Sequence, residues 1–248
     1  MITFVELGEK SDKTPLIAVP GIDGSIGSVK PVVEGLAKSR KVYVADYTGE
    51  ENDTLEGLSQ EIANAIDDEI SGSFHLLGQS IGSIAAAQLA TDYELPVKQV
   101  ALMCTFTKLN WTQLRISNFF MRLTPNWLYR LTTRPVMAYV CGPVLDGDDH
   151  PFFWASRNSD KSKVIKRTAW QIDRDFTPDL NKIQRPLLVL MGKQDRFVPD
   201  AEQEIKKLSG MYRMKQDASV EAIAEAGHVF LPSHAINLAI QRIDDFLS

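Results

Sequence analysis

Seven short apolar segments recur along the chain and alternate with longer segments of helical periodicity. The apolar segments are residues 2–7, 15–19, 41–46, 74–78, 99–104, 186–192 and 220–226. Most of them are too uniformly apolar for one face to meet water, which is typical of strands inside a parallel sheet covered on both sides. Strands that alternate with helices indicate right-handed βαβ units. The pattern therefore predicts an α/β fold, a three-layer sandwich with a mostly parallel sheet of about seven to eight strands.

The segments between the expected strands have the spacing of amphipathic helices. Leu55, Leu58, Ile62 and Ile66 fall on one face of a helix expected over residues 54–70. Further helices are expected over residues 25–38, 161–176 and 233–247.

One long segment breaks this alternation. After residue 104 no strand pattern returns until Pro186, and all four tryptophans lie between these points. Thr124 is placed as the N-cap of a further helix, with Pro125 at its first position. Linkers are poor in aromatic residues, so we predict a helical insertion rather than a linker. The expected domains are a core of residues 1–106 and 181–248 and a helical cap of residues 107–180.

Composition and charge narrow the function classes. A chain of 248 residues with 44% apolar and 24% charged residues is typical of a soluble globular protein. A net charge of −5 without a long basic run argues against a nucleic-acid partner. No apolar run approaches the roughly 20 residues that span a bilayer, and the first residues do not form a secretory signal. The only cysteines, Cys104 and Cys141, suggest a reducing compartment, and we expect a cytoplasmic protein.

The segment Gly78-Gln79-Ser80-Ile81-Gly82 lies between an expected strand and an expected helix. A chain that reverses from strand to helix within about three residues crowds its neighbours, and glycine two positions either side removes the colliding Cβ atoms. The apex residue is then strained and exposed at the carboxyl end of the strand, next to a helix N-terminus that stabilises negative charge. The interpretation is a nucleophile elbow at Ser80. The alternative is an ordinary glycine-rich turn.

A serine hydroxyl becomes a good nucleophile when a histidine takes its proton, and a carboxylate must orient that histidine. His228 is the best candidate base because it follows a strand and a glycine, just before the last helix. His75 lies inside a strand and is better explained as a hydrogen-bonded core residue. His150 falls in an acidic loop of the insertion, and His234 falls in the first turn of the last helix.

Two carboxylates follow the strand at residues 186–192. Asp195 lies in the turn just past the strand and is the candidate for orienting His228, although a surface-loop carboxylate is the alternative. Asp200 lies further along, where capping of the next helix explains it well.

The order Ser80, Asp195, His228 resembles that of the α/β-hydrolase family, with serine esterases and lipases among its members. The resemblance covers nearly the whole chain and includes the segments "VPGIDGS", "GQSIG", "GKQDRFVP" and "AGHVF". It implies a helical cap where the insertion lies, and an oxyanion hole made by the backbone N–H groups of Ile22 and Ile81. Many relatives carry His-Gly where this chain has Pro20-Gly21, but a backbone donor does not depend on that histidine. Asp23 beside this loop is unusual and has no assigned role.

The resemblance and the serine nucleophile together imply hydrolysis of carboxylic esters through an acyl-enzyme. Thioester hydrolysis, including that of an acyl carrier, uses the same machinery, and carbon–carbon bond hydrolysis ranks third. A binding or scaffold member of the fold is the non-enzymatic alternative. No metal-ligand spacing and no dinucleotide-binding glycine loop is present, so we expect a reaction without metal or cofactor.

The insertion is expected to determine the substrate. Its aromatic residues suggest an apolar acyl pocket, although they could equally join insertion to core. The candidates for substrate contact are Trp111, Phe119, Phe120, Trp127 and Trp154. The insertion also carries eleven basic and seven acidic residues, whereas the rest of the chain is net negative. One hypothesis is that an anionic acyl carrier docks on a basic surface that includes Lys163, Lys166 and Arg167. The alternative is a solvated basic face.

Overall fold

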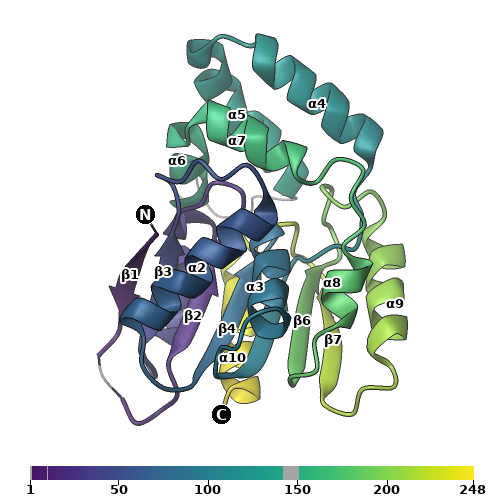
Figure 1. Cartoon of the computed structure of the whole chain (residues 1–248). Coiled ribbons are helices and arrows are strands. Elements are labelled where there is room, and N and C mark those ends of the chain that lie inside the picture. The colour runs from purple at the N-terminus through teal and green to yellow at the C-terminus, as the bar shows by residue number, and fades with distance from the viewer. Residues whose placement is uncertain (1, 10, 142–150) are drawn as a thin grey trace.

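A seven-stranded sheet forms the centre of the protein in the computed structural model, which describes residues 2–9, 11–141 and 151–248 (Figure 1). The strands are β1 (Thr3–Leu7), β2 (Leu16–Val19), β3 (Val42–Asp46), β4 (Phe74–Gln79), β5 (Val97–Met103), β6 (Leu187–Gly192) and β7 (Ala218–Ile223). Their order is β1-β3-β2-β4-β5-β6-β7, and every neighbouring pair is parallel except β1 and β3. The predicted fold class and its seven strands are confirmed.

The apolar runs became the innermost strands because both of their faces are covered. Every residue of β4 and of β6 is buried, with Phe74 and Leu76 facing one layer of helices and Leu77 facing the other. The last strand is shorter than predicted and ends at Ile223 instead of residue 226. Its continuation turns away, and the Ala226 carbonyl accepts a hydrogen bond from the Gln194 N–H in the loop after β6.

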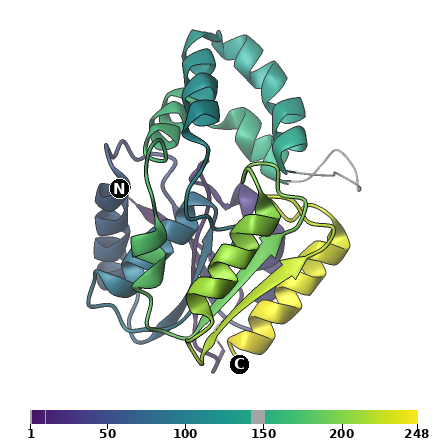
Figure 2. The ribbon, with the colours of Figure 1, turned by 90° about the vertical axis from the view of Figure 1, so that its right-hand side faces the viewer.

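Helices cover both faces of the sheet (Figure 2). One layer, α1 (Lys30–Leu36) and α10 (Ser233–Phe246), packs on one face. The opposite layer consists of α2 (Leu55–Glu69), α3 (Ile81–Thr91), α8 (Thr177–Asn181) and α9 (Ala201–Tyr212).

Two predicted helices are shorter than expected. The segment 25–38 divides into a 3₁₀ turn, η1 (Ile26–Ser28), followed by α1. The helix expected over 161–176 is α7 (Lys161–Ala169), and the turn after it leads into Asp173. Asp173 has φ 60°, a left-handed conformation that a right-handed helix does not continue through.

Of the helices described between β5 and β6, α8 packs on the sheet, whereas four others lie beyond the carboxyl ends of the strands (Figure 1). These inserted helices are α4 (Trp111–Leu123), α5 (Asn126–Cys141), α6 (Pro151–Asn158) and α7. The predicted N-cap role of Thr124 is wrong. Its hydroxyl donates to the Phe120 carbonyl at 2.7 Å and therefore closes α4, whereas Pro125 directly precedes α5.

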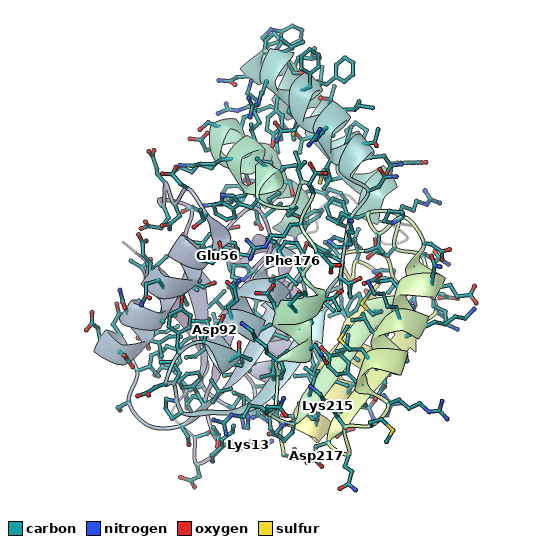
Figure 3. All side chains as sticks on the ribbon, turned by 45° about the vertical axis from the view of Figure 1, so that its right-hand side comes forward. Lys13, Glu56, Asp92, Phe176, Lys215 and Asp217 are labelled. Atoms are coloured by element: carbon teal, nitrogen blue, oxygen red, sulfur yellow. The ribbon has the colours of Figure 1, made fainter. Side chains whose placement is uncertain are left out.

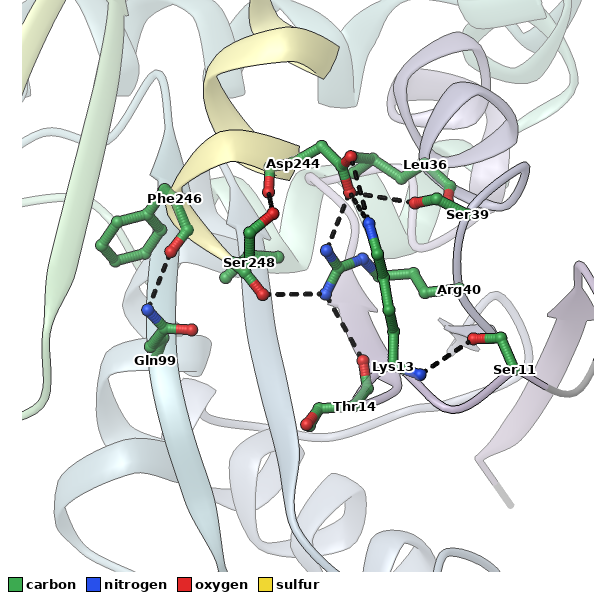
Figure 4. A network of polar contacts seen from close by, with 11 residues as sticks. Ser11, Lys13, Thr14, Leu36, Ser39, Arg40, Gln99, Asp244, Phe246 and Ser248 are labelled. Atoms are coloured by element: carbon green, nitrogen blue, oxygen red, sulfur yellow. Dashed lines mark hydrogen bonds and ion pairs between the residues drawn. The ribbon is translucent and has the colours of Figure 1, made fainter.

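A buried arginine joins segments near the beginning and the end of the chain, at the opposite end of the strands from the inserted helices (Figure 4). Arg40 is 1% exposed, and its Nη2 lies 2.8 Å from Asp244 Oδ1 on α10. Its Nη1 donates to the carbonyls of Thr14 and Leu247. Because a buried charge without partners is costly, this cluster fixes α10, the helix that follows His228.

Candidate active site

Ser80 lies at the sharp turn from β4 into α3. Its φ of 55° and ψ of −128° form a strained conformation for a residue with a side chain. A Cβ at position 82 would collide with the carbonyl oxygens of Pro20 and Val19, and one at position 78 with the backbone of residues 82 and 83. Glycine is therefore required on both sides of the turn. The Ser80 hydroxyl makes no hydrogen bond that caps α3, so it can bond elsewhere.

The structure brings Ser80, His228 and Asp195 into one chain of hydrogen bonds. Ser80 Oγ lies 2.7 Å from His228 Nε2, and His228 Nδ1 lies 2.7 Å from Asp195 Oδ2. The backbone N–H groups of Phe197 and Val198 donate to Asp195 Oδ1 at 2.8 and 3.1 Å, so both carboxylate oxygens have partners. A carboxylate only accepts, which places the imidazole proton on Nδ1 and leaves Nε2 to accept from the serine hydroxyl.

Contacts that the sequence analysis missed hold the His228 loop in place. The Phe197 ring lies 4.5 Å from the imidazole, centre to centre. Gln79, next to Ser80, donates to the His228 carbonyl through Nε2 at 3.3 Å. In retrospect, the apolar "FVP" after Asp195 was a signal that this turn packs inward, since an exposed loop has little need of such residues.

The loop after β2 passes directly beside Ser80 and carries Ile22. Ile22 and Ser80 line the same cavity, and Ile81 is the first residue of α3. The first N–H groups of a helix have no partner within the helix, so the Ile81 N–H is available to a ligand near Ser80.

Two side chains fix the Ile22 loop: Tyr47, which the sequence analysis did not single out, and Arg167, which it assigned to a basic docking surface. The Tyr47 hydroxyl lies 2.6 Å from the Pro20 carbonyl oxygen and 2.5 Å from that of Gly21. Arg167 on α7 donates to the Ile22 carbonyl at 3.0 Å and to the Tyr47 carbonyl, and its guanidinium lies over the Tyr47 ring. The helix insertion therefore holds the backbone of the loop directly.

Asp23 is a buried carboxyl group in this loop. Burial raises the pKa of Asp23 to about 6, although hydrogen bonds such as that from Ser25 Oγ at 2.6 Å and the charge of Arg167 act in the opposite direction. The group lines the cavity beside Ser80 and changes charge in the range where many proteins operate. Its side chain is thus a titratable element at the edge of the site.

A cavity of about 320 Å³ lies above Ser80 and beneath the inserted helices. Its walls combine the Ser80 turn and the Ile22 loop with Leu114 and Phe120 of α4 and with several residues of α5. Of the five aromatic candidates, Phe120 lines this cavity. Phe119, Trp127 and Trp154 are exposed and lie outside its lining, and the side chain of Trp111 lies outside the described part of the chain.

The structure does not place His75 or His234 where either could act as the base for Ser80. His75 is buried in β4, and burial, followed by the charges of Arg40 and Lys98, lowers its pKa to about 4, so it stays neutral. Its Nδ1 has no hydrogen-bond partner among the described residues, which differs from the expected hydrogen-bonded histidine. His234 pairs with Glu225 at 3.0 Å, and His150 lies outside the described residues.

Asp200 is the N-cap of α9, as its alternative explanation anticipated. Its Oδ1 accepts a hydrogen bond from the Gln203 N–H at 2.9 Å.

The basic residues of α7 bind the core of the protein. Lys163 donates to the Thr48 carbonyl at 2.8 Å, and Lys166 donates to the Glu51 carbonyl at 2.6 Å and pairs with Asp53 at 2.7 Å. Arg167 is buried, and it binds the Ile22 and Tyr47 carbonyls. These three side chains therefore attach α7 to the loops after β2 and β3. The structure gives no support to the idea that they form a docking surface for an anionic carrier.

The described residues contain neither a cluster of metal-binding side chains nor a helix that could span a membrane. Across residues 2–9, 11–141 and 151–248, no three His, Cys, Asp or Glu side chains gather as a metal would require. The helices in these same ranges are all too short or too polar to cross a membrane.

The fold and sequence were compared with known proteins. A sequence model of the alpha/beta hydrolase family matches residues 17–239. The search of curated proteins returned no match. Among solved structures, a hydrolase from Pseudomonas aeruginosa PA01 is similar at TM-score 0.83 and 17% identity, with 100% of this chain and 94% of that chain covered.

Two further solved structures are similar to this chain. An enol-lactonase from Burkholderia xenovorans LB400 matches at TM-score 0.80 and 17% identity, with 99% and 96% of the two chains covered. A putative lipase from Acinetobacter baumannii AYE matches at TM-score 0.78 and 18% identity, with 99% and 87% covered. At such identities the likeness concerns the fold.

Proposed function

From the premise that the chain belongs to the alpha/beta hydrolase family, we propose that it hydrolyses carboxylic esters through a covalent acyl-enzyme on Ser80. The observation that carries the proposal is the continuous chain Ser80–His228–Asp195, with 2.7 Å at each step and every member buried. Ser80 and His228 line one cavity. A binding protein would have no physical need for this arrangement.

In the proposed first step, Ser80 Oγ attacks the ester carbonyl carbon while His228 Nε2 takes the hydroxyl proton. Asp195 holds the imidazole in the required tautomer and stabilises the positive charge that develops on it. The tetrahedral intermediate collapses when the same Nε2 proton passes to the departing alcohol. The acyl group is then esterified to Ser80.

The negative charge of the tetrahedral intermediate falls beside the start of α3 and the Ile22 loop. We assign the backbone N–H groups of Ile22 and Ile81 as its hydrogen-bond donors, because fixed donors aimed at developing charge lower the barrier most effectively. Arg167 and Tyr47 are positioning residues here, since they hold the Ile22 loop through its carbonyl oxygens.

The second half-reaction reverses the roles. His228 takes a proton from water, the resulting hydroxide equivalent attacks the acyl carbonyl, and Ser80 leaves with the proton. The cavity under α4 and α5 supports an apolar acyl group as the substrate part that binds there. In this proposal residues 107–180 act as a cap whose helices select the acyl group.

A fluorophosphonate probe tests the proposal because it labels an activated serine and leaves ordinary serines unmodified. We expect stoichiometric labelling of the wild-type chain and none of Ser80→Ala. A panel of nitrophenyl esters graded by acyl length, together with the matching acyl thioesters, should show turnover that Ser80→Ala lowers by several powers of ten. The control is Ser209→Ala, which removes an exposed hydroxyl on α9 and should be labelled like the wild type. Labelling of Ser80→Ala, or no labelling of the wild-type chain, would refute the assignment.

A further inference from the structure

Helices α4 and α5 leave large apolar side chains uncovered. Eight of the eleven large hydrophobic residues that are exposed among the described residues lie on these two helices, each at least 50% exposed. We call this set the apolar face: Ile116, Phe119, Phe120, Leu123, Trp127, Leu131, Val136 and Tyr139. The α4 members recur at helical spacing and so form one stripe, and Trp127 and Leu131 lie one turn apart on α5. Val136 and Tyr139 lie on other sides of α5, where Val136 lines the cavity and the Tyr139 ring contacts Arg196 of the loop after β6. Soluble proteins rarely leave so many such side chains together without a partner.

The charges on the same two helices are of one sign. Residues 111–141 contain four arginines and no acidic residue. Arg115 pairs with Asp173 of the segment after α7, while Arg122 and Arg130 are exposed among the apolar side chains. Aromatic and leucine side chains interspersed with basic residues are typical of helices that lie in the interface of a lipid bilayer. Anionic lipids add about 1 kcal/mol for each basic residue near their surface.

The apolar face is continuous with the cavity that contains Ser80. Phe120 and Val136 belong to both, being 61% and 50% exposed while also lining the cavity. The mouth of the cavity therefore opens at this face. The two helices also lie at the extremity of the molecule, away from the sheet (Figures 1 and 2), so a flat surface can reach them without meeting the core. Figure 3 shows ring side chains projecting from this extremity.

We propose that the apolar face docks on an anionic lipid bilayer, with Arg122 and Arg130 at the level of the headgroups and the cavity mouth turned toward the lipid. A second copy of the chain fits the face less well. A symmetric pair would bring these arginines close to their counterparts, and neither helix offers a carboxylate to neutralise them. The docking is independent of the proposed function. The further idea that the bilayer delivers an acyl substrate to Ser80 rests on the proposed function.

The test is sedimentation of the full chain with vesicles of phosphatidylcholine, with and without phosphatidylglycerol. The Ser80→Ala variant is used so that hydrolysis does not alter the lipid. We expect binding to the anionic vesicles that weakens at high salt. Leu123→Ser combined with Leu131→Ser should weaken it at least about 10-fold, because two side chains no longer enter the interface. Arg122→Glu combined with Arg130→Glu should weaken binding to anionic vesicles by a similar factor.

Met214→Ser is the matched control, since Met214 is 90% exposed but lies after α9, and it should bind like the parent. Absence of binding to anionic vesicles, or equal binding by the Leu123/Leu131 variant, would overturn the proposal. So would a concentration-dependent dimer in analytical ultracentrifugation that the same variant abolishes, if vesicles are not bound. Hydrolysis of a short water-soluble ester separates the two proposals. Vesicle binding without such hydrolysis would refute the esterase assignment and leave the docking in place.

Discussion

The rim of the sheet around Ser80 is tightly packed, whereas the helices α4 and α5 are sparsely packed. At the rim, Ser80, His228 and Asp195 are each less than 8% exposed, and backbone groups fix the Asp195 carboxylate and the His228 loop. On α4 and α5 most side chains are exposed, and Leu114, Asn118 and Thr133 are the described residues that are buried. The first region is determined by many simultaneous contacts, and the second by few.

This difference separates two tasks. Reacting atoms must be held to within a fraction of an ångström, which requires a shell of packed neighbours. A surface that receives an apolar group must instead accept different shapes, which a sparsely packed pair of helices can do. Two buried attachments join the insertion to the rim. Arg167 of α7 binds the Ile22 loop, and the side chains of Phe152 and Phe153 of α6 form an apolar cluster with Val229 and Leu231, next to His228.

The largest effect is expected for a change at the rim. His228→Ala removes the base, and we expect kcat/KM for a soluble ester to fall by at least about 10⁴-fold. Asp195→Asn should cost less, because an amide can still contact the ring although it favours the wrong tautomer. Stopped-time ester assays measure both. A loss below about tenfold for His228→Ala would mean that the proton goes elsewhere.

Gly82→Ala should be the most damaging change to stability. Its methyl group would meet the carbonyl oxygens at the end of β2, and neither backbone can yield cheaply. We expect the free energy of unfolding to fall by about 3 to 4 kcal/mol in urea titrations. Gly210→Ala in α9, where nothing lies within 4 Å, is the control and should gain up to about 1 kcal/mol. Equal effects at both positions would contradict a tightly determined rim.

Asp23 gives the rim a dependence on pH. Since burial raises its pKa from 3.8 to about 6, the neutral form favours the folded state. The stability that this form provides is complete below pH 3.8 and is lost as the pH rises through about 6, to a total of about 3 kcal/mol. Asp23→Asn has a side chain that stays neutral, so this variant should keep that stability at all pH values. The variant should therefore gain about 3 kcal/mol relative to wild type between pH 3.8 and pH 7.5, as measured by urea unfolding. A constant difference across this range would show that Asp23 is not desolvated.

The attachment of α7 should divide into one strong and one weak contact. Arg167→Met removes a buried guanidinium and its hydrogen bonds to the Ile22 and Tyr47 carbonyls, of which the Tyr47 carbonyl keeps the bond from the Glu50 N–H, so we expect a loss of about 2 kcal/mol. The matched Lys166→Met removes an ion pair with the 91% exposed Asp53 side chain and an exposed hydrogen bond to the Glu51 carbonyl, and it should cost no more than about 0.5 kcal/mol. Urea unfolding of the two variants under identical conditions measures the contrast. Similar losses would place the attachment at the surface.

Strand positions were predictable because burial on both faces leaves an unbroken apolar run, as in β4 and β6. The ends of β7 and α7 were not, since they depend on contacts between distant segments. Strand β7 ends before Ala226, whose carbonyl accepts a hydrogen bond from the Gln194 N–H, and α7 ends before Asp173, which is left-handed. Local patterns of this kind describe the interior of an element better than its end.

The candidate site divides in the same way. Ser80, Asp195 and His228 were nominated from local motifs and their order, and the structure places them within hydrogen-bond distance, while their catalytic roles remain predictions. The positioning roles of Tyr47 and Arg167 were missed because these side chains bind backbone carbonyls, which a pattern of side chains does not reveal. Their own contact joins positions 120 residues apart. The positive charge of the insertion was visible in the sequence, but the acceptors of that charge were not.

Because Ser80 has a positive φ, the residue that would make this turn most resistant to heat is not the one that carries the reacting hydroxyl. Glycine would relax that turn and recover about 1 kcal/mol or more, while the hydroxyl would disappear. A library of this chain screened solely for survival on heating should consequently drift toward glycine at position 80. Selection schemes that seek a tougher biocatalyst from this scaffold must monitor turnover in every round.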